Sequence, residues 1–342
     1  MPRAGSARGS DGRLSTAVPK AAVVGTGVIG TIYASILLEQ GWSVDHLVRQ
    51  SPSHTRPERV NVDLWDLRKG HERRSRRSYE YTFVEALPAE AELVLVPVRL
   101  YQLEGALRTF SGMPGDVTAV IFTAIWTGPE PLDAALPNGN YVLADALAGG
   151  EISGDRLTAT IKPSLPLGAV HPFAEPRAAK VSEIFSGAGL APTHEHDILH
   201  WHWLQYALNA AMWPALVEAG TARAVVSDRV CLRRMMATLR EALRVCEARG
   251  VAVGRYPETR VFLDESAGVT SRVRAWMIRK AYGLSVVHSE YHRRCMLHAL
   301  KDPKEIATAY SAVLATGRDL GCDMTAFESY GDTIARFRQA AL

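Results

Sequence analysis

The sequence predicts an α/β domain with a doubly wound, mostly parallel sheet, followed by an all-helical domain. A strand, a glycine-rich turn and a helix follow one another at residues 22–40. Fully apolar runs such as residues 93–98 are typical of buried parallel strands. Later in the chain, strand signals give way to long amphipathic helical patterns. The predicted divisions are a disordered tail at 1–19, a Rossmann-type α/β domain at 20–190 and a helical domain at 191–342.

The composition is that of a globular protein and argues against several classes. Apolar residues make up 47% of the chain and charged residues 22%. The net charge of +3 argues against a dedicated nucleic-acid binder. The four cysteines are widely spaced and form no CxxC pair, which favours reduced thiols in a cytoplasmic protein. No apolar stretch is long enough to predict a membrane span, and the Arg/Gly/Ser-rich tail lacks the apolar core of a secretion signal.

The glycine-rich turn has the pattern of a dinucleotide-binding loop, with a strand before it and a helix after it. Gly25 allows a tight turn out of the strand, and Gly27 lets a pyrophosphate approach the backbone closely. Gly30 lets the helix pack against the strand, so that the first N–H groups of the helix face the anion. The predicted cofactor-binding residues of this turn are Gly25, Thr26, Gly27, Val28, Ile29 and Gly30.

The end of the second predicted strand, residues 43–49, indicates which dinucleotide binds. NAD-binding folds usually place Asp or Glu there to hold the ribose 2′-hydroxyl, whereas an Arg accommodates the 2′-phosphate of NADP. Arg49 stands at this end, and the nearby acid, Asp45, falls mid-strand. The sequence therefore favours NADP(H). The alternative is that Arg49 is only a solvated strand end.

Most of the remaining first half is predicted as strands. Residues 56–79 are the most charged part of the chain, which predicts a solvated loop or a hairpin edge. Ligands of doubly wound sheets bind beyond the carboxyl ends of the strands, so Arg99 and residues 123–128 are candidate walls of a cleft. The further predicted strands are residues 118–122, 141–144, 158–161 and 165–170.

The helices are predicted from apolar periodicity and from stop signals. Residues 197–219 form a long apolar-aromatic helix with Asp197 as its N-cap and Pro214 as a candidate kink. An amphipathic helix at 233–249 is stopped by Gly250. Further helices are predicted at residues 178–188, 275–300 and 303–320.

Several fragments, in a consistent order over roughly residues 20–330, form a larger pattern. They are GTGVIG in the glycine turn, Val-Arg at the end of the second strand, VPVRLYQ at residues 96–102, the strand that ends at Phe122, WHWLQYALN at Trp201 to Asn209, and the helix at residues 313–321. Together they resemble the ketopantoate reductase (2-dehydropantoate 2-reductase) family.

The resemblance implies a Rossmann domain, a 6-phosphogluconate-dehydrogenase-like helical domain, NADPH and hydride delivery to a 2-keto acid. In the family, a lysine on the first helix of the second domain polarises the ketone and donates a proton. This sequence has Gln205 at that position and Trp213 where the family has a second Asn. Where the family has a Lys, this sequence has Arg99, and where the family has Gln-Asn-Gly, it has Thr-Ala-Ile at residues 123–125. The family's first Asn on the helix is retained as Asn209.

The missing lysine changes the expected chemistry. Glutamine can hydrogen-bond to a carbonyl but cannot supply a proton, and losing a positioned general acid typically costs about 10²–10⁴ in rate. Ketopantoate is therefore not the expected substrate. Gln205 and Asn209 stay catalytic candidates, and Trp126, Trp203 and Trp213 are predicted to contact a flatter or more apolar substrate.

Other groups could supply the missing proton or hold charge. His288 and Glu290, in a segment dense in titratable side chains, are predicted catalytic residues; the alternative is that they are solvated or satisfied by packing. Arg99 is predicted to bind cofactor phosphates or a substrate carboxylate, or else to form a salt bridge across the cleft. Tyr206 is a weaker acid candidate, because it points about 100° away from Gln205 on a helix.

Two further histidine groups have plainer interpretations. His196 and His200 have the i, i+4 spacing of a metal-binding pair, but no third ligand has a settled spacing, so no metal site is predicted. His171 follows a strand end, where it either lines the cleft or belongs to a loop.

The sequence therefore predicts an NADPH-dependent oxidoreductase that reduces a ketone or imine other than ketopantoate, in specialised biosynthesis. One alternative is a non-redox enzyme that reuses the fold for condensation, cyclisation or hydrolysis. Another is a non-catalytic NADPH-binding protein. The expected protein is a cytoplasmic homodimer that binds a small-molecule substrate and has no nucleic-acid or membrane partner.

Overall fold

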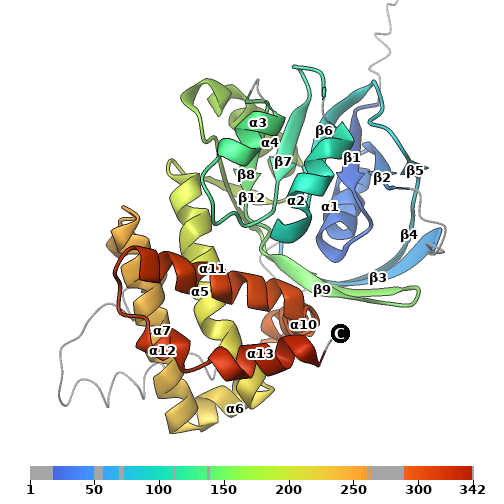
Figure 1. Cartoon of the computed structure of the whole chain (residues 1–342). Coiled ribbons are helices and arrows are strands. Elements are labelled where there is room, and N and C mark those ends of the chain that lie inside the picture. Colours follow the sequence, from blue (N-terminus) through green and yellow to red (C-terminus); the bar gives the residue numbers. More distant parts are fainter. Residues whose placement is uncertain are drawn as a thin grey trace, which may run out of the picture.

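The computed structural model describes residues 18–49, 57–68, 73–110, 112–136, 139–259, 262 and 289–340. An α/β domain forms the upper part of the molecule in Figure 1, and a cluster of helices forms the lower part. The α/β domain is built on an eight-stranded sheet of order β12-β11-β8-β7-β6-β1-β2-β5. The strands of this sheet are β1 (Lys20–Val24), β2 (Ser43–Leu47), β5 (Phe83–Val84), β6 (Ala91–Val96), β7 (Thr118–Ile121), β8 (Tyr141–Ala144), β11 (Ser164–Gly168) and β12 (Ala191–His194).

The strand order makes this a doubly wound sheet. From β1 the chain adds β2 and β5 on one side, and then β6, β7 and β8 on the other, all in parallel. Helices α1 (Val28–Glu39) and α4 (Glu175–Gly187) pack in the apolar core on one face. Helices α2 (Leu100–Leu107) and α3 (Glu130–Ala135) pack in the core on the other face. The carboxyl ends of β1, β6, β7 and β8 therefore share one edge, with the switch point between β1 and β6.

A second sheet of four strands, in the order β4-β3-β10-β9, lies beside α1. The charged segment forms its β3–β4 hairpin, which confirms the predicted hairpin edge. The side chains of Val60, Val62 and Leu64 are buried toward the α1 core, whereas most of β4 carries exposed arginines. The strands of this sheet are β3 (Arg59–Asp66), β4 (Arg73–Glu80), β9 (Ala148–Ser153) and β10 (Arg156–Ile161).

The second half of the described chain is helical, as predicted. Helix α5 (Ile198–Ala219) runs from the sheet domain through the helical domain and packs against α7 (Arg229–Ala248) and α11 (Pro303–Asp319) (Figure 1). Pro214 lies inside α5, and the helix continues past it to Ala219. No helix in the described ranges is long and apolar enough to cross a membrane. The remaining helices are α6 (Ala222–Ser227), α10 (Glu290–Ala299), α12 (Thr325–Glu328) and α13 (Gly331–Gln339).

The structure differs from two expectations near the junction of the two domains. Strand β12 falls after residue 190, yet it pairs in parallel with β11, so the sheet extends into the segment assigned to the helical domain. Asp197 is the N-cap residue of α5, but its side chain makes no capping hydrogen bond. Of the helix predicted at residues 275–300, the described part is α10; the rest lies outside the described residues.

Candidate functional site

The glycine turn between β1 and α1 has the local geometry that its sequence predicts. Gly25 adopts φ +83°, a conformation that side chains rarely allow, and its N–H donates to the Leu47 carbonyl at 2.9 Å. A Cβ on Gly30 would stand 2.7 Å from Val23 Cγ1, so α1 packs against β1 only because residue 30 is glycine. A Cβ on Gly27 would meet no atom within 4 Å. The space in front of Gly27 is therefore open.

The start of α1 next to Gly27 is suited to an anion. Gly27 is the N-cap residue, so no side chain caps the helix, and the first turn carries no acidic residue. The N–H groups of Val28, Ile29 and Gly30 come first in this helix, where backbone N–H groups lack intrahelical acceptors. Such N–H groups and the helix dipole together favour a phosphate. The open cradle at Gly27 and these donors fit the pyrophosphate of a dinucleotide.

His46 on β2 supports the glycine turn from beneath, a feature that the sequence analysis did not predict. Its Nδ1 lies 2.6 Å from the Gly25 carbonyl oxygen, and its Nε2 lies 2.6 Å from the Tyr79 hydroxyl on β4. A carbonyl can only accept, so Nδ1 carries the proton and Nε2 accepts from Tyr79. His46 is fully buried, and burial lowers its pKa below the ordinary value. It is therefore a neutral strut between the turn and the second sheet.

The two predicted anion-binding arginines both lie against α2 at the carboxyl edge. Arg49 is exposed beyond the end of β2 and donates to the Gly105 carbonyl in α2. Arg99 is the N-cap residue of α2 and forms ion pairs with Asp302 and with Glu305, the latter at 2.8 Å. Glu305 lies in α11, and Asp302 is the N-cap residue of that helix. Arg99 therefore forms a salt bridge between the two domains, which was one of the two interpretations given by the sequence analysis.

Helix α5 presents a polar face toward the sheet edge. Trp201, Gln205 and Asn209 are spaced four residues apart, so they share one face, and all three are half-buried. The indole N–H of Trp201 donates to the Asp145 carboxylate at 3.1 Å, and Asp145 directly follows β8. This contact places the face with Gln205 and Asn209 beside the carboxyl end of β8.

His202, the neighbour of Trp201, also lies at the carboxyl edge of the sheet. It is 2% exposed and lies by the backbone of Thr123 and Ala144, which follow β7 and end β8. Burial lowers the pKa of His202 to about 4, so its imidazole is neutral near pH 7. The sequence analysis assigned no role to His202.

The three tryptophans predicted to contact the substrate make contacts within the protein that stabilise its fold. The Arg249 guanidinium lies 4.1 Å from the Trp126 ring and 3.6 Å from the Trp203 ring. Trp126 is 5% exposed, stacks on Tyr206 and donates to Thr316, which leaves little of its ring for a ligand. Trp203 donates to the Thr127 carbonyl, and the half-buried Trp213 packs against the helical core. Substrate contact by these tryptophans stays a prediction.

Two other acid candidates have surroundings that keep them from donating protons near neutrality. Tyr206 is buried, and burial raises its pKa above the ordinary value. Glu290 accepts from Arg293 and Arg294, both at 2.6 Å, and these guanidinium groups lower its pKa to about 2. Glu290 is therefore a carboxylate that could hold charge but could not act as an acid. His288 lies outside the described residues.

Two further histidines, His171 and His194, each pair with a carboxylate. Strand β11 runs antiparallel to β8, so it delivers His171 to the opposite edge of the sheet, where His171 pairs with Asp133 at 2.8 Å. This excludes His171 from the cleft and corrects one of its two interpretations. His194 pairs with Glu175 at 2.8 Å. Among the described residues, no group of three or more His, Cys, Asp or Glu side chains could hold a metal ion.

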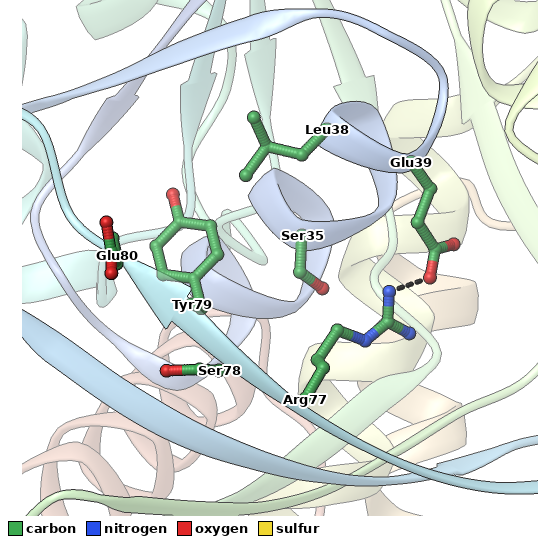
Figure 2. A pocket seen from close by; sticks show the side chains of 7 residues that line it. All are labelled: Ser35, Leu38, Glu39, Arg77, Ser78, Tyr79 and Glu80. Carbon is green, nitrogen blue, oxygen red and sulfur yellow. Dashed lines mark ion pairs between the residues drawn. The ribbon is translucent and has the colours of Figure 1, made fainter.

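A shallow pocket of about 460 Å³ lies between the last turns of α1 and strand β4, with the ion pair of Arg77 and Glu39 at its rim (Figure 2). Ser35 and Leu38 line it from the helix. These residues follow Gly27 by eight or more positions, about 12 Å along the helix axis. The pocket is therefore separate from the glycine turn.

One protein-family model and several solved structures are similar to this chain. Residues 21–136 match the family model described as ketopantoate reductase PanE/ApbA. No curated protein matches the sequence. A solved PanE/ApbA family ketopantoate reductase from Ralstonia eutropha JMP134 is 15% identical, with a TM-score of 0.68, over 94% of this chain and 99% of that one.

Two further solved structures share the fold. A D-mandelate dehydrogenase solved with NADH and anilino(oxo)acetate is 13% identical, with a TM-score of 0.66, over 94% of this chain and 99% of that one. A dimeric ketopantoate reductase from Staphylococcus aureus is 12% identical, with a TM-score of 0.64, over 94% and 100%. These neighbours are oxidoreductases. Residues 21–136 thus resemble the ketopantoate reductase family model, and the chain shares the fold of the solved ketopantoate reductases over almost its whole length.

Proposed function

We propose that the protein is an NADPH-dependent oxidoreductase that reduces a ketone or imine other than ketopantoate. The observation that carries the proposal is the open glycine turn at the start of α1, where no side chain caps the helix and a Cβ on Gly27 would meet no atom within 4 Å. When bound there, the reduced nicotinamide supplies a hydride. The change of the family's lysine to Gln205 supports a substrate other than ketopantoate.

NADP rather than NAD is favoured by the charges around the end of β2. Arg49 is exposed there, and a 2′-phosphate needs a cation of this kind. The nearby acid, Asp45, lies within β2 and pairs with Lys20 at 3.2 Å, so its carboxylate is engaged away from a ribose. The residues proposed to hold the cofactor are Gly25, Thr26, Gly27, Val28, Ile29, Gly30 and Arg49, because the guanidinium of Arg99 is engaged by Asp302 and Glu305.

The role of α5 follows from the chemistry of its side chains. Gln205 and Asn209 can donate hydrogen bonds to a carbonyl oxygen and so orient it, but an amide has no proton to transfer at neutral pH. The D-mandelate dehydrogenase was solved with anilino(oxo)acetate, an aromatic relative of a 2-keto acid. We extend this class to the present protein and propose a 2-oxo acid or a cyclic imine as its substrate. The dimeric neighbour supports a homodimer.

Titration calorimetry and turnover test this proposal together. The wild-type protein is expected to bind NADPH at least about tenfold more tightly than NADH, because the latter lacks the 2′-phosphate. An Arg49→Gln variant is expected to lose this preference. With NADPH bound, aromatic 2-oxo acids such as benzoylformate are expected to oxidise the cofactor faster than ketopantoate does. Absence of NADPH binding would refute the proposal, and binding without oxidation on this panel would favour a non-catalytic NADPH binder.

The His46 strut supports a second expectation about the cofactor. We expect His46→Leu to raise the Kd for NADPH about tenfold, because the Gly25 carbonyl loses the donor that fixes the turn. Thr31→Val is the matched control. It removes the 3.0 Å contact between the hydroxyls of Thr31 on α1 and Tyr81, just after β4, and leaves the contacts of His46 with Gly25 and Tyr79 in place. Equal losses of affinity in both variants would show that general loosening, rather than the strut, sets the affinity.

A further inference from the structure

Asp145 lies where four elements of the two domains converge. It directly follows β8 at the carboxyl edge of the large sheet, and the indole N–H of Trp201 on α5 donates to its carboxylate at 3.1 Å. Its charge acts on the hydroxyls of Tyr33 from α1 and Tyr291 from α10. Among the described residues, no cation forms an ion pair with Asp145. The Asp145 carboxyl therefore contacts α5 directly and interacts electrostatically with hydroxyls from α1 and α10.

The groups around Asp145 are polar but poorly satisfied. Tyr33 is fully buried, and its hydroxyl has no hydrogen-bond partner among the described residues. The Lys162 ammonium lies 4.2 Å from the centre of the Tyr291 ring, and Cys295 hydrogen-bonds to Tyr291 from the next turn of α10. A buried hydroxyl without a partner costs free energy unless a ligand or water completes it. This cluster therefore has the character of a binding site for a polar group.

The cluster adjoins the polar face of α5. Trp201 and Gln205 are one turn apart, about 6 Å along the helix axis. Asp145 accepts a hydrogen bond from Trp201, so its carboxyl lies against the face of α5 that also carries Gln205, one turn further along the helix. A carbonyl group that hydrogen-bonds to Gln205 would thus have Asp145 as a neighbour on the sheet side.

We propose that Asp145 is the proton donor that takes the place of the missing lysine, with Gln205 orienting the carbonyl. This inference rests on the proposed function. In the step, the carbonyl carbon gains the hydride supplied by the reduced nicotinamide, and the carbonyl oxygen gains the carboxyl proton of Asp145. The products are an alcohol, the oxidised nicotinamide and an Asp145 carboxylate, which takes a proton back from water.

The electrostatics of the cluster agree with this role. Burial raises the pKa of the Asp145 carboxyl above its ordinary value, and the Trp201 hydrogen bond opposes this only in part. Burial also raises the pKa of Tyr33 and of Tyr291, so both stay protonated. The cations nearest to the cluster, Lys162 and Arg68, act on Cys295 and on Tyr33. A carboxylic acid that keeps its proton toward neutral pH is a suitable general acid.

Carbon-13 NMR of protein labelled at the aspartate carboxyl carbons tests the inference without cofactor or substrate. Asp145→Asn assigns the resonance, since the amide keeps the shape of the side chain. We expect Asp145 to titrate at least about one pH unit above the ordinary aspartate value. Trp201→Phe removes the hydrogen bond that favours the carboxylate, so it should move the midpoint higher still. An ordinary midpoint in the wild type would overturn the inference.

Kinetics supply the second arm and separate the two proposals. With benzoylformate and NADPH, Asp145→Asn is expected to lower kcat by about 10²–10⁴ while the Kd for NADPH changes less than threefold. Unchanged kcat in this variant would overturn the role of Asp145 and leave the oxidoreductase proposal standing. Failure of the wild type to bind NADPH would instead refute the proposed function, whatever the NMR midpoint of Asp145.

Discussion

Replacing Gly27 with aspartate is expected to raise the Kd for NADPH at least about 100-fold without destabilising the fold. Gly27 is the N-cap of α1, with φ −72° and ψ 172°, a conformation that aspartate adopts without strain. A Cβ there meets no atom within 4 Å, so the side chain fits. Its carboxylate would accept hydrogen bonds from the same helix N–H groups that a pyrophosphate needs, and it would repel the phosphates. Calorimetric titration with NADPH measures the loss.

The same substitution should leave or even raise the melting temperature, because an aspartate N-cap stabilises a helix by about 0.5–2 kcal/mol. Gly115→Asp is the matched control. Gly115 also has an open Cβ direction and precedes β7 at the opposite edge of the sheet, so this variant adds the same charge away from α1. Retained NADPH affinity in Gly27→Asp would mean that the dinucleotide does not bind at this turn.

The sequence predicted the fold best where local patterns decide it. Apolar runs predicted β6, β7 and β8, and periodicity with a glycine stop predicted α7, because burial on both faces or on one helical stripe leaves a direct mark in sequence. Strand β9 escaped notice, since its AGGEIS sequence carries two glycines and little β-branched character. Strand β12 was also missed: its APTH sequence carries no clear strand signal, and its place in the sheet comes from pairing with β11.

The direction of β11 could not be read from its residues. Its apolar sequence predicts a strand but is silent on whether that strand runs with β8 or against it. Parallel pairing would have brought His171 to the cleft; the observed antiparallel pairing takes it to the other edge. Topology thus decided the place of a candidate residue whose local sequence allowed both interpretations.

Local sequence predicted one part of the candidate site, whereas contacts between distant residues determine the rest. The conformations of Gly25 and Gly30 follow from a motif of six residues, and the structure agrees with both. The strut consists of two contacts, Gly25 with His46 and His46 with Tyr79, which span 21 and 33 positions and join two sheets, so no local sequence motif predicts it. Asp145 is likewise unremarkable in sequence. It becomes a candidate only because α5 packs against the end of β8 and α10 packs against the following strand, β9.

The surroundings of Glu290 show that a charged cluster in the sequence need not be a site of acid–base chemistry. Its sequence neighbours suggested acid–base chemistry, but the structure surrounds it with guanidinium groups. Arg294, one turn later on α10, is 3% exposed and reaches the second sheet, where it donates to the carbonyls of Asp63 and Ala159 at 2.8 and 2.7 Å. It also lies 3.3 Å from the Asp63 carboxylate. Arg294 is thus a buried connection between a late helix and the α/β domain.

Replacing Arg294 with methionine is therefore expected to destabilise the protein by about 3–5 kcal/mol, the usual cost of removing one partner from a buried ion pair. Methionine fills much of the space but leaves two buried carbonyls without donors and Asp63 with only exposed partners such as Arg74. The free energy of unfolding in urea measures the effect. Arg293→Met is the matched control: Arg293 also pairs with Glu290, but its side chain is 58% exposed, so a loss below about 1 kcal/mol is expected.

The pH dependence of this loss follows from Asp63 and Glu290. The hydrogen bond from Arg74, with help from Arg294, lowers the pKa of Asp63 to about 2, and Arg293 and Arg294 lower that of Glu290 to about 2. Carboxyls with a lowered pKa in the folded state contribute stability above their unfolded pKa, near 4, and lose it as the pH falls toward 2. Arg294→Met raises both pKa values, so its deficit should be largest above pH 5 and shrink between about pH 4 and pH 2. A deficit equal to that of Arg293→Met, or one independent of pH, would show that Arg294 does not hold α10 to the sheet through these charges.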